Sequence, residues 1–566
     1  MTPRPHLRAP ALALALLSGC GPAPWDGPTL TRPRDQLTVD QLHGEAVPEL
    51  LDMSFLARPD WADGDGEPVV ATLSLAATDL AMDFPATRDL YAGEDRFPAL
   101  ELELVVDGGR LLPRQTGLVR TDEDSAWDVL LGEGAAWREA EDGDWSRASL
   151  PVALVDRYFN QVRNCVATFV YRDDAVSPTY LQCSQETADA DDEQLGDLQA
   201  LVPTERAAAE WDADAVVTEH ARIRDGRLPV RPLSGWDANG DLAAVFDKRL
   251  ITRASTSVGA VYADGTLWVH PANTRHGPHP YPSEQRHGVY SVTKTLVGAL
   301  AVFHFAERYG AEIVDLPVTD LVPELAGAEG WEGVTLGDAL NMATGTRGGE
   351  SADLLFEPLV LAESRAEALA NIAALGDAEA GPGEAFGYAT TNTFVVSCAL
   401  QGLVEQREGP GVRYWDLLRD DVLVPIGAAG LDVLLTREDP AERIPYLGFG
   451  ARLRLDHAAK IAVLMANEGE HAGQQLLHRG LLREALGRTD WEGLAIDGQH
   501  RYRHGFWSRT VRTGSCDAQV AYMQGHGANH VLLLPSGAIV FRFMDEQDEN
   551  IVPLVRGAER VLSSCE

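Results

Sequence analysis

Two residues near the middle of the chain, Ser291 and Lys294, have the types and the spacing for nucleophilic catalysis. They lie near the start of the stretch GVYSVTKTLVGALAVFHFAERYG (288–310), where apolar residues recur every three or four positions before Gly310. This pattern predicts one helix, and residues three apart share a helix face. A lysine held in a dry cleft has its pKa lowered enough to take a proton from a serine hydroxyl. The alternative is a serine at a helix start followed by a lysine in solvent.

The length and composition limit the classes of protein to consider. A chain of 566 residues, 45% of them apolar, is long enough for two or three domains with their own cores. Acidic residues number 86 against 47 basic ones, which gives a formal net charge of −39. Such a surface repels phosphate backbones, so we expect no nucleic-acid partner.

The first twenty residues have the pattern of an export signal. A short positive region precedes the apolar run Ala11–Leu17, which is too short to span a bilayer. The run ends in Leu-Ser-Gly-Cys, which resembles a bacterial lipobox with Cys20 as the lipidated residue. Gly21 follows, and no aspartate that would signal retention in the inner membrane. We therefore expect a signal peptide over 1–20 and a lipid-anchored protein of the bacterial cell envelope, periplasmic or surface-facing and held at the outer membrane. An ordinary cleaved signal peptide is the alternative.

Export places the remaining five cysteines in an oxidising compartment, where disulfides persist. Cys165 and Cys183 are close together in a strand-rich region, and we expect them to pair. Cys516 with Cys565 is the second expected pair. Cys398 lies in an apolar helical stretch, as expected for a buried thiol.

Changes in composition and hydrophobic pattern divide the chain into segments. Residues 21–66 are rich in Pro, Asp and Gly, which predicts a flexible tether. Residues 67–205 contain short alternating runs and Gly-rich turns, which predict a small β-sandwich-like domain. Residues 206–566 contain the serine, a hairpin signal at Asp264-Gly265, and several helical patterns.

The order of motifs around Ser291 resembles the β-lactamase-related serine hydrolases, which include class C β-lactamases, D-alanyl-D-alanine carboxypeptidases and esterases. The S-V-T-K sequence is followed by the segment VTLGDALNMATG (334–345) and then by PGEAFGY (382–388), which resembles the lead-in to the family's second motif. The resemblance covers about residues 240–566. It implies an α+β fold for the C-terminal part: an antiparallel sheet flanked by helices, preceded here by a small all-β domain.

The resemblance also implies roles for residues of the second motif. Tyr388 corresponds to the tyrosine that carries protons near the serine, and Thr390 stands where much of the family has an asparagine. A lysine ammonium beside the phenol is expected to lower the pKa of Tyr388 toward the working pH.

The third motif departs from the lysine-containing form of the family. The best match is Gly525 to Asn529, GHGAN, which resembles the H-G-G and W-G-G variants of esterases and amidases. It implies a backbone N–H that joins that of Ser291 in an oxyanion hole. The substrate- or oxyanion-binding residues implied at the two motifs are Thr390, His526, Gly527, Ala528 and Asn529.

Taken together, these features predict an exported serine hydrolase that cleaves an ester or amide of a small molecule or peptide through an acyl-enzyme on Ser291. Lys294 and Tyr388 are expected to move its proton. A histidine-rich loop before the serine lacks acidic or cysteine ligands at suitable spacing, so we expect no metal and no cofactor. One alternative is a D,D-carboxypeptidase or β-lactamase acting on cell-wall peptides or β-lactams. Another is a catalytically silent surface lipoprotein that binds a ligand.

Overall fold

The computed structural model of the protein describes residues 37–83, 90, 92–121, 124–187, 196–209, 211–247, 256–376, 380–514, 516–544 and 548–563. The expected signal peptide with Cys20, the first part of the expected tether, and Cys565 lie outside these ranges. Among the helices of the described ranges, none combines the length and apolar character needed to cross a bilayer.

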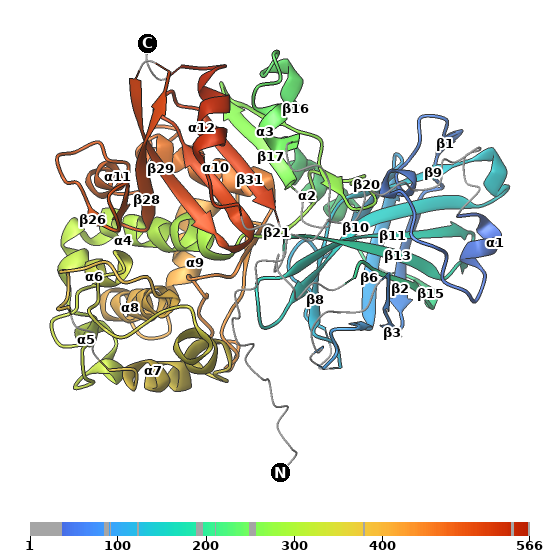
Figure 1. Ribbon diagram of the computed structural model, residues 1–566. Helices are drawn as coiled ribbons and strands as arrows, with labels where there is room; N and C mark the ends of the chain where they lie inside the picture. The colour runs from blue at the N-terminus through green and yellow to red at the C-terminus, as the bar shows by residue number, and fades with distance from the viewer. Residues whose placement is uncertain are drawn as a thin grey trace.

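In the described N-terminal part, thirteen strands form one sheet that curls around its own core (Figure 1). One end of the strand path is β15, and only Pro203 separates it in the chain from β14, which is next to the last strand at the other end, β4. The carbonyl of Pro203 accepts a hydrogen bond from Ala76 N–H, just after β2, at 3.0 Å. The sheet therefore closes into a barrel-like unit. Its strands are β1 (Gly64–Asp65), β2 (Val69–Leu75), β4 (Ala81–Met82), β6 (Leu100–Asp107), β7 (Arg110–Pro113), β8 (Trp127–Leu131), β9 (Gly134–Arg138), β10 (Ser146–Asp156), β11 (Val162–Arg172), β12 (Ala175–Val176), β13 (Thr179–Thr187), β14 (Leu198–Val202) and β15 (Thr204–Ala208).

This single sheet differs from the expected sandwich of two sheets. The strands β10 and β11 are eleven residues long each, and β10 is buried along its whole length. Strands of this length can bend and take part in both walls of a barrel, so no break between two sheets is needed. Cys165 and Cys183 face each other across β11 and β13 and form a disulfide. The other expected bridge has one described member, Cys516, which is disulfide-bonded.

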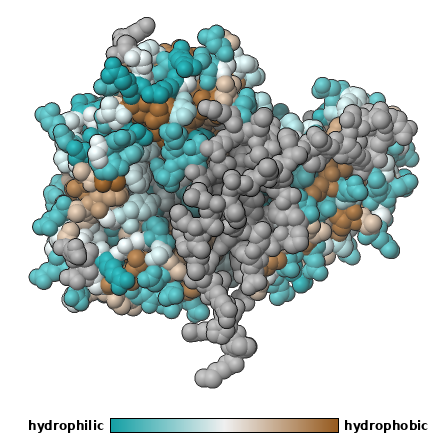
Figure 2. All heavy atoms as spheres, in the orientation of Figure 1, coloured by the Kyte–Doolittle hydropathy of each residue, from teal (hydrophilic) through white to brown (hydrophobic). Residues whose placement is uncertain are grey.

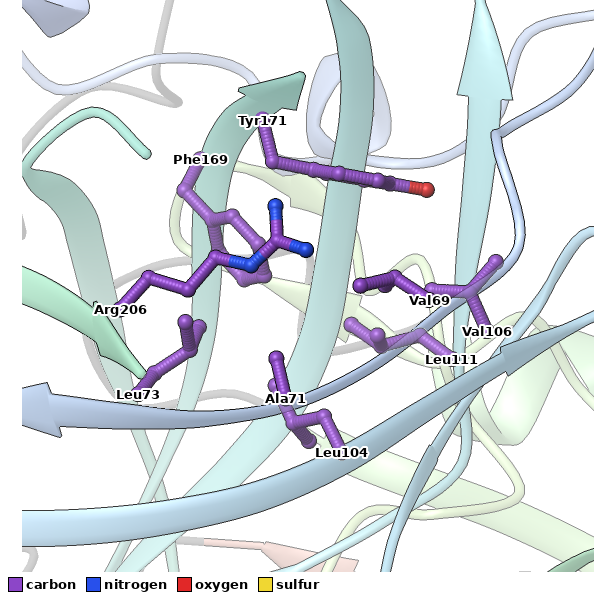
Figure 3. A pocket seen from close by; sticks show the side chains of 9 residues that line it. All are labelled: Val69, Ala71, Leu73, Leu104, Val106, Leu111, Phe169, Tyr171 and Arg206. Atoms are coloured by element: carbon purple, nitrogen blue, oxygen red, sulfur yellow. The ribbon is translucent and has the colours of Figure 1, made fainter. Parts of the chain in front are cut away.

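The barrel interior is filled by side chains. Figure 3 shows a shallow hollow among them, with Tyr171 and Arg206 beside apolar residues of neighbouring strands. The Tyr171 hydroxyl donates to the carbonyl of Glu67 at 2.7 Å, so this polar group already has a partner. The hollow is lined by Val69, Ala71, Leu73, Leu104, Val106, Leu111, Phe169, Tyr171 and Arg206.

The expected tether is wrong from residue 37 onward. Leu42, Met53 and Leu56 are fully buried against the outer face of β11, where Val166 and Val170 meet them. The Pro-, Asp- and Gly-rich composition hid this because the few apolar residues lack a regular period. Their burial removes apolar area from water, which is enough to fix an otherwise irregular segment. The helix α1 (Val39–Leu42) lies within it.

The C-terminal part is built on a nine-stranded sheet that is antiparallel except for the pairing of β16 with β18. Asp264 and Gly265 both have positive φ in the expected hairpin between β17 and β18. In path order the strands are β16 (Val230–Pro232), β18 (Thr266–Val269), β17 (Thr256–Ala263), β31 (Ile539–Met544), β30 (Asn529–Leu533), β29 (Cys516–Gly525), β28 (Phe506–Thr513), β27 (His500–Arg503) and β26 (Leu494–Ala495).

Helices cover both faces of this sheet (Figure 1). Phe246 and Leu554 belong to the core between the sheet and the helices α3 and α12, while the core on the opposite face includes α4 and α10. This is the expected antiparallel sheet flanked by helices. The remaining described α-helices and their bounds are α2 (Ala213–Asp225), α3 (Ala243–Asp247), α4 (Leu300–Tyr309), α5 (Val318–Leu321), α6 (Leu336–Leu340), α7 (Arg365–Ala373), α8 (Thr390–Glu408), α9 (Tyr414–Leu418), α10 (Leu455–Ala466), α11 (Arg479–Ala485) and α12 (Val552–Glu559).

Short strands complete the described part of the fold. The pairing of β21 with β23 lies directly before the Ser291 segment. These strands are β3 (Thr78–Asp79), β5 (Arg96–Phe97), β19 (Asn273–Thr274), β20 (Gly277–Pro278), β21 (His287–Gly288), β22 (Asp432–Val433), β23 (Ala451–Leu453), β24 (Glu470–His471) and β25 (Gln474–Gln475). Figure 2 shows hydrophilic side chains over much of the visible surface and small separate hydrophobic patches, in keeping with the acidic composition.

Candidate active site

Ser291 lies in a turn between a strand and a helix, and the expected single helix over 288–310 is divided. The strand β21 takes the first residues, Tyr290 has a left-handed φ of 46°, and a 3-10 turn spans Tyr290–Val292. A π-helical segment, Lys294–Ala299, then leads into α4. The helix begins late because the pairing of β21 with β23 holds its expected first residues extended. π-Helical segments often occur at functional sites.

Lys294 is buried, with 2% of its surface exposed, and its ammonium has three oxygen partners. Its Nζ lies 2.8 Å from Ser291 Oγ, 2.8 Å from Thr390 Oγ1 and 2.9 Å from the carbonyl oxygen of Gly448. Burial lowers the pKa of Lys294 to about 8, although the charge of Glu350 acts in the opposite direction. The neutral amine is therefore accessible near pH 8, and it lies within reach of the serine proton.

Tyr388 lies on the other side of this pair. Its hydroxyl lies beside Ser291, and the Lys294 Nζ is 4.8 Å from the centre of its ring. Burial of the phenol, together with the charge of Glu350, raises the pKa of Tyr388 well above its usual value. The expected tyrosinate is therefore wrong, because desolvation and a nearby carboxylate outweigh the lysine. The raised pKa of Tyr388 favours its protonated form, which makes Lys294 the stronger candidate for the base.

Thr390 connects the lysine to a carboxylate that the sequence analysis missed. Thr390 is 1% exposed, and both its N–H and its hydroxyl donate to the Glu350 carboxylate at 2.8 Å. Thr390 is covered by its neighbours and its hydroxyl is engaged on both sides, so in this structure it links Lys294 to Glu350 through hydrogen bonds.

Glu350 escaped notice because it is forty residues from Thr390 and belongs to no recognised motif. One local signal was present: it follows Gly348 and Gly349. A Cβ at Gly348 would lie 2.5 Å from the Ala389 Cβ, so glycine allows this loop to approach the residue before Thr390. The Gly348-Gly349 pair was therefore a signal that the backbone before Glu350 packs closely against another segment, here the one at Ala389.

The third motif is a tight turn between β29 and β30. The glycine of this motif that packs against the serine turn is Gly525, whereas the expected one was Gly527. A Cβ at Gly525 would lie 2.2 Å from the Val289 carbonyl oxygen and 3.2 Å from Ser291 N. The end of β29 therefore packs directly on the nucleophile turn, as an oxyanion hole that includes Ser291 N–H requires. The next two expected residues, Gly527 and Ala528, are buried with φ of 74° and 59°.

The two remaining residues of this motif separate into an exposed and a buried one. His526 is exposed, and its ring centre lies 5.3 Å from that of Tyr290, beside the serine. Asn529 is fully buried; its Nδ2 donates to the His526 carbonyl at 2.6 Å, and its Oδ1 accepts from Met544 N–H. The strand directs the Asn529 side chain inward, where it braces the turn, so its own side chain is engaged within the protein.

An aromatic wall continues from Tyr388. Phe386 and Trp507 lie with ring centres 6.3 Å and 5.8 Å from the Tyr388 ring, and Tyr502 packs on both of them. Aromatic rings bury large apolar area and contact other rings edge-on or offset. The four rings therefore form a continuous apolar cluster beside Tyr388, which we call the aromatic wall.

One acidic cluster among the described residues has a geometry that a cation could use: Asp83, Asp197 and His276. It lies in and beside the barrel, and Arg275 already donates to Asp197 Oδ1 at 2.9 Å. Although burial opposes ionisation, Arg275 and His276 lower the pKa of Asp197 to about 2. The cluster is an ion-pair network around a compensated carboxylate.

Residues 242–465 match the family model described as Beta-lactamase. Among solved structures, the chain is similar to a penicillin-binding protein homologue from Caulobacter crescentus (18% identity, TM-score 0.42, covering 57% of this chain and 97% of that one). It is also similar to a family VIII carboxylesterase (19%, 0.42, 59% and 99%) and to a class C β-lactamase (15%, 0.42, 62% and 98%). No curated protein matches this chain significantly.

The matched segment includes the helix start with Ser291 and Lys294 as well as Tyr388 and Thr390, and it ends before the turn at Gly525. The similarities to solved structures are distant. Over residues 242–465, which are less than half of its length, this chain is therefore similar to the β-lactamase family.

Proposed function

We propose that this protein is a serine hydrolase that cleaves an ester or amide bond through an acyl-enzyme on Ser291. The observation that supports this most strongly is the continuous hydrogen-bonded path from Ser291 through Lys294 and Thr390 to Glu350. In this path Ser291 can act as the nucleophile, Lys294 as its base, and Glu350 as the charge that balances the lysine through Thr390.

The path defines which atom of the lysine accepts a proton. An ionised Glu350 can only accept, so the single hydroxyl hydrogen of Thr390 points to Glu350 and its oxygen accepts from Lys294. A neutral lysine amine has two hydrogens, which Thr390 Oγ1 and the Gly448 carbonyl accept. The nitrogen lone pair is then left for the hydroxyl hydrogen of Ser291.

The reaction follows from this arrangement. Lys294 takes the Ser291 proton as the serine oxygen attacks the substrate carbonyl, and the resulting ammonium is balanced by Glu350 through Thr390. The Ser291 N–H and a backbone N–H of the turn after β29 stabilise the tetrahedral oxyanion. Tyr388 lies beside Ser291 and is placed to donate a proton to the leaving group. The Lys294 ammonium then returns a proton to Tyr388, so that the serine proton is in effect transferred to the leaving group. Water then releases the acyl group from Ser291.

The charges around the site favour a substrate that lacks a carboxylate. In lysine-containing relatives of this family the third-motif lysine attracts the penicillin carboxylate, whereas this chain has His526 at that place. Glu350 and Glu549 both lie close enough to Tyr388 to raise its pKa. A negative substrate group would meet these carboxylates, so we propose a neutral or cationic ester or amide with an apolar group against the aromatic wall.

Two steady-state measurements test this substrate class. We expect kcat/KM for a neutral p-nitrophenyl ester to exceed that for the matched ester with a terminal carboxylate by at least about tenfold, since one unfavourable charge contact costs about 1.4 kcal/mol or more. The variant His526→Lys should lower this ratio, because the added positive charge should raise kcat/KM for the ester that has a terminal carboxylate. Equal or better turnover of the charged ester, or efficient acylation by benzylpenicillin, would favour the D,D-carboxypeptidase or β-lactamase alternative.

The pH dependence of acylation follows from the lysine. Below its pKa, Lys294 is an ammonium and cannot accept the serine proton, so kcat/KM should rise with pH and level off above about 8. Because the pKa of Tyr388 is raised well above 10, loss of its proton should cause no falling limb below about pH 10. A stopped-flow acylation profile between pH 5.5 and 10 measures this. A profile that is flat, or that falls through pH 8, would exclude a lysine base.

Export and lipid anchoring at Cys20 remain part of the proposal. They are supported by the signal-like sequence of residues 1–20 and by the disulfide between Cys165 and Cys183, which persists in oxidising compartments. Radiolabelled palmitate incorporation in a bacterial host, lost in Cys20→Ala, tests the anchor.

A further inference from the structure

The barrel reaches the nucleophile turn through the hairpin that joins β10 to β11. At its tip, Asn160 is fully buried between the two parts of the protein. Its Oδ1 accepts from the Tyr290 N–H at 2.7 Å, and its Nδ2 donates to the carbonyl of Ala451 at 3.1 Å. A residue of the N-terminal barrel therefore binds the backbone next to Ser291.

The hydrogen bond that Asn160 accepts comes from Tyr290, whose backbone conformation is unfavourable. Tyr290 has a φ of 46°, a left-handed conformation that is unfavourable for residues with a Cβ and that costs about 1–3 kcal/mol. This conformation sets the direction in which the following residue, Ser291, presents its N–H and its hydroxyl. An acceptor fixed on the Tyr290 N–H opposes relaxation of the turn.

The other half of the amide binds the loop that holds the lysine. Ala451 is close to Gly448, whose carbonyl accepts from Lys294, and the N–H groups of Gly450 and Ala451 both donate to Thr293 Oγ1. Asn160 thus connects the serine turn and the lysine loop from one side chain. A shift of its position would alter the distance between the nucleophile and its base.

The packing around the hairpin tip is close. A Cβ at Gly288 would lie 1.7 Å from the Asn160 carbonyl oxygen, so glycine is required where β21 meets the barrel. The Arg452 guanidinium donates to the carbonyl of Asp156, and the Phe159 ring lies 5.4 Å from that of Phe356. The tip is therefore held from several sides.

We propose that the barrel is part of the catalytic unit and that Asn160 is its positioning residue, acting by fixing Tyr290 and the Ala451 loop around Ser291 and Lys294. This inference depends on the proposed serine hydrolase function. It gives the N-terminal domain a role in acylation that is separate from any role in anchoring.

The test measures how fast a fluorophosphonate modifies Ser291 in the full-length protein. For Asn160→Ala we expect the maximal inactivation rate to fall about 10- to 100-fold, because a misplacement of about 1 Å can cost about 10² in rate. The inhibition constant for reversible binding should stay within about twofold, since Asn160 does not contact substrate. If this variant does not fold, Asn160→Ser replaces it, because the serine side chain is too short to reach Tyr290 N–H. We expect the same fall in the maximal inactivation rate for this variant.

A matched control comes from the same hairpin and the same interface. Asn164, on β11, makes two hydrogen bonds to the backbone of Arg286, each 2.8 Å long, five residues before Ser291 in the chain. Asn164→Ala should lower the melting temperature about as much as Asn160→Ala while keeping the inactivation rate within about threefold of wild type. Equal rate losses in the two variants, in proportion to their melting temperatures, would overturn the proposal.

A second variant pair tests the mechanism itself. Glycine adopts positive φ without penalty, so in a Tyr290→Gly background the further substitution Asn160→Ala should reduce the rate several-fold less than it does with Tyr290 present. An undiminished effect would overturn the role assigned to the Tyr290 conformation. If the fluorophosphonate does not modify wild-type protein at all, the proposed serine hydrolase function is contradicted. If it modifies wild-type protein and Asn160→Ala at the same rate, only the positioning role of Asn160 is contradicted.

Discussion

Replacing Lys294 with methionine is expected to lower kcat/KM for ester hydrolysis by about 10³-fold or more. Methionine has a similar length and volume but no lone pair that accepts the serine proton, and general-base catalysis typically contributes about 10²- to 10⁴-fold. Lys294 is 2% exposed, so solvent has little access to the atoms between it and Ser291 and cannot readily substitute as the base. The remaining rate would come from the oxyanion donors and substrate binding.

The control for this variant is Lys460→Met. Lys460 is also largely covered and pairs with Asp456 at 2.7 Å, in a different part of the domain. Its substitution should affect the melting temperature and leave kcat/KM within about twofold. Steady-state hydrolysis at pH 8.5, with folding checked by circular dichroism, measures both. If Lys294→Met keeps more than about a tenth of the wild-type value, a different group is the base.

Glu350→Gln is expected to lower the maximal acylation rate about 10- to 100-fold. The amide can donate to Thr390 Oγ1, which allows the threonine hydroxyl to donate toward Lys294 and occupy its lone pair. Hydrogen bonds to an ionised group contribute about 1.5–3 kcal/mol, which corresponds to this range. Because Glu350 is exposed to solvent on its outer side, we expect the lower half of the range.

The same variant should also move the pH profile. The charge of Glu350 raises the pKa of Lys294, so its removal should lower that pKa and shift the rising limb to lower pH. In a Thr390→Val background, Glu350→Gln should have little further effect on the rate, because the connection to Lys294 is already lost. Additive losses in the double variant, or a shift of the rising limb to higher pH, would contradict this path.

The sequence allowed a good part of the hydrolase domain to be predicted. Ser291 and Lys294 were identifiable from their spacing on one predicted helix face, and Tyr388 from the resemblance of its surrounding motif to the family's second motif. The hairpin at Asp264-Gly265 was identifiable because few residues adopt its backbone conformation. In the structure the Lys294 Nζ lies 2.8 Å from Ser291 Oγ and 4.8 Å from the centre of the Tyr388 ring, so the three side chains lie together.

What could not be predicted depends on contacts between distant segments. Glu350 meets Thr390 across forty residues, and Asn160 meets Tyr290 across 130, through hydrogen bonds that leave no periodic pattern. The pKa of Tyr388 was predicted in the wrong direction because burial and the Glu350 charge were unknown. The segment after residue 37 looked like a tether because composition alone does not show that Leu42 and Met53 meet a barrel wall.

The most direct test of the account is the mass of the purified protein after reaction with a fluorophosphonate. The account predicts a single phosphonyl adduct, mapped by peptide sequencing to Ser291 and absent from Ser291→Ala. It also predicts that the rate of adduct formation rises with pH to a plateau above about 8. An adduct that persists in Ser291→Ala, or a wild-type protein that forms none, would contradict the assignment of Ser291 as the nucleophile. The second result would instead favour a surface lipoprotein that binds a ligand without turning it over.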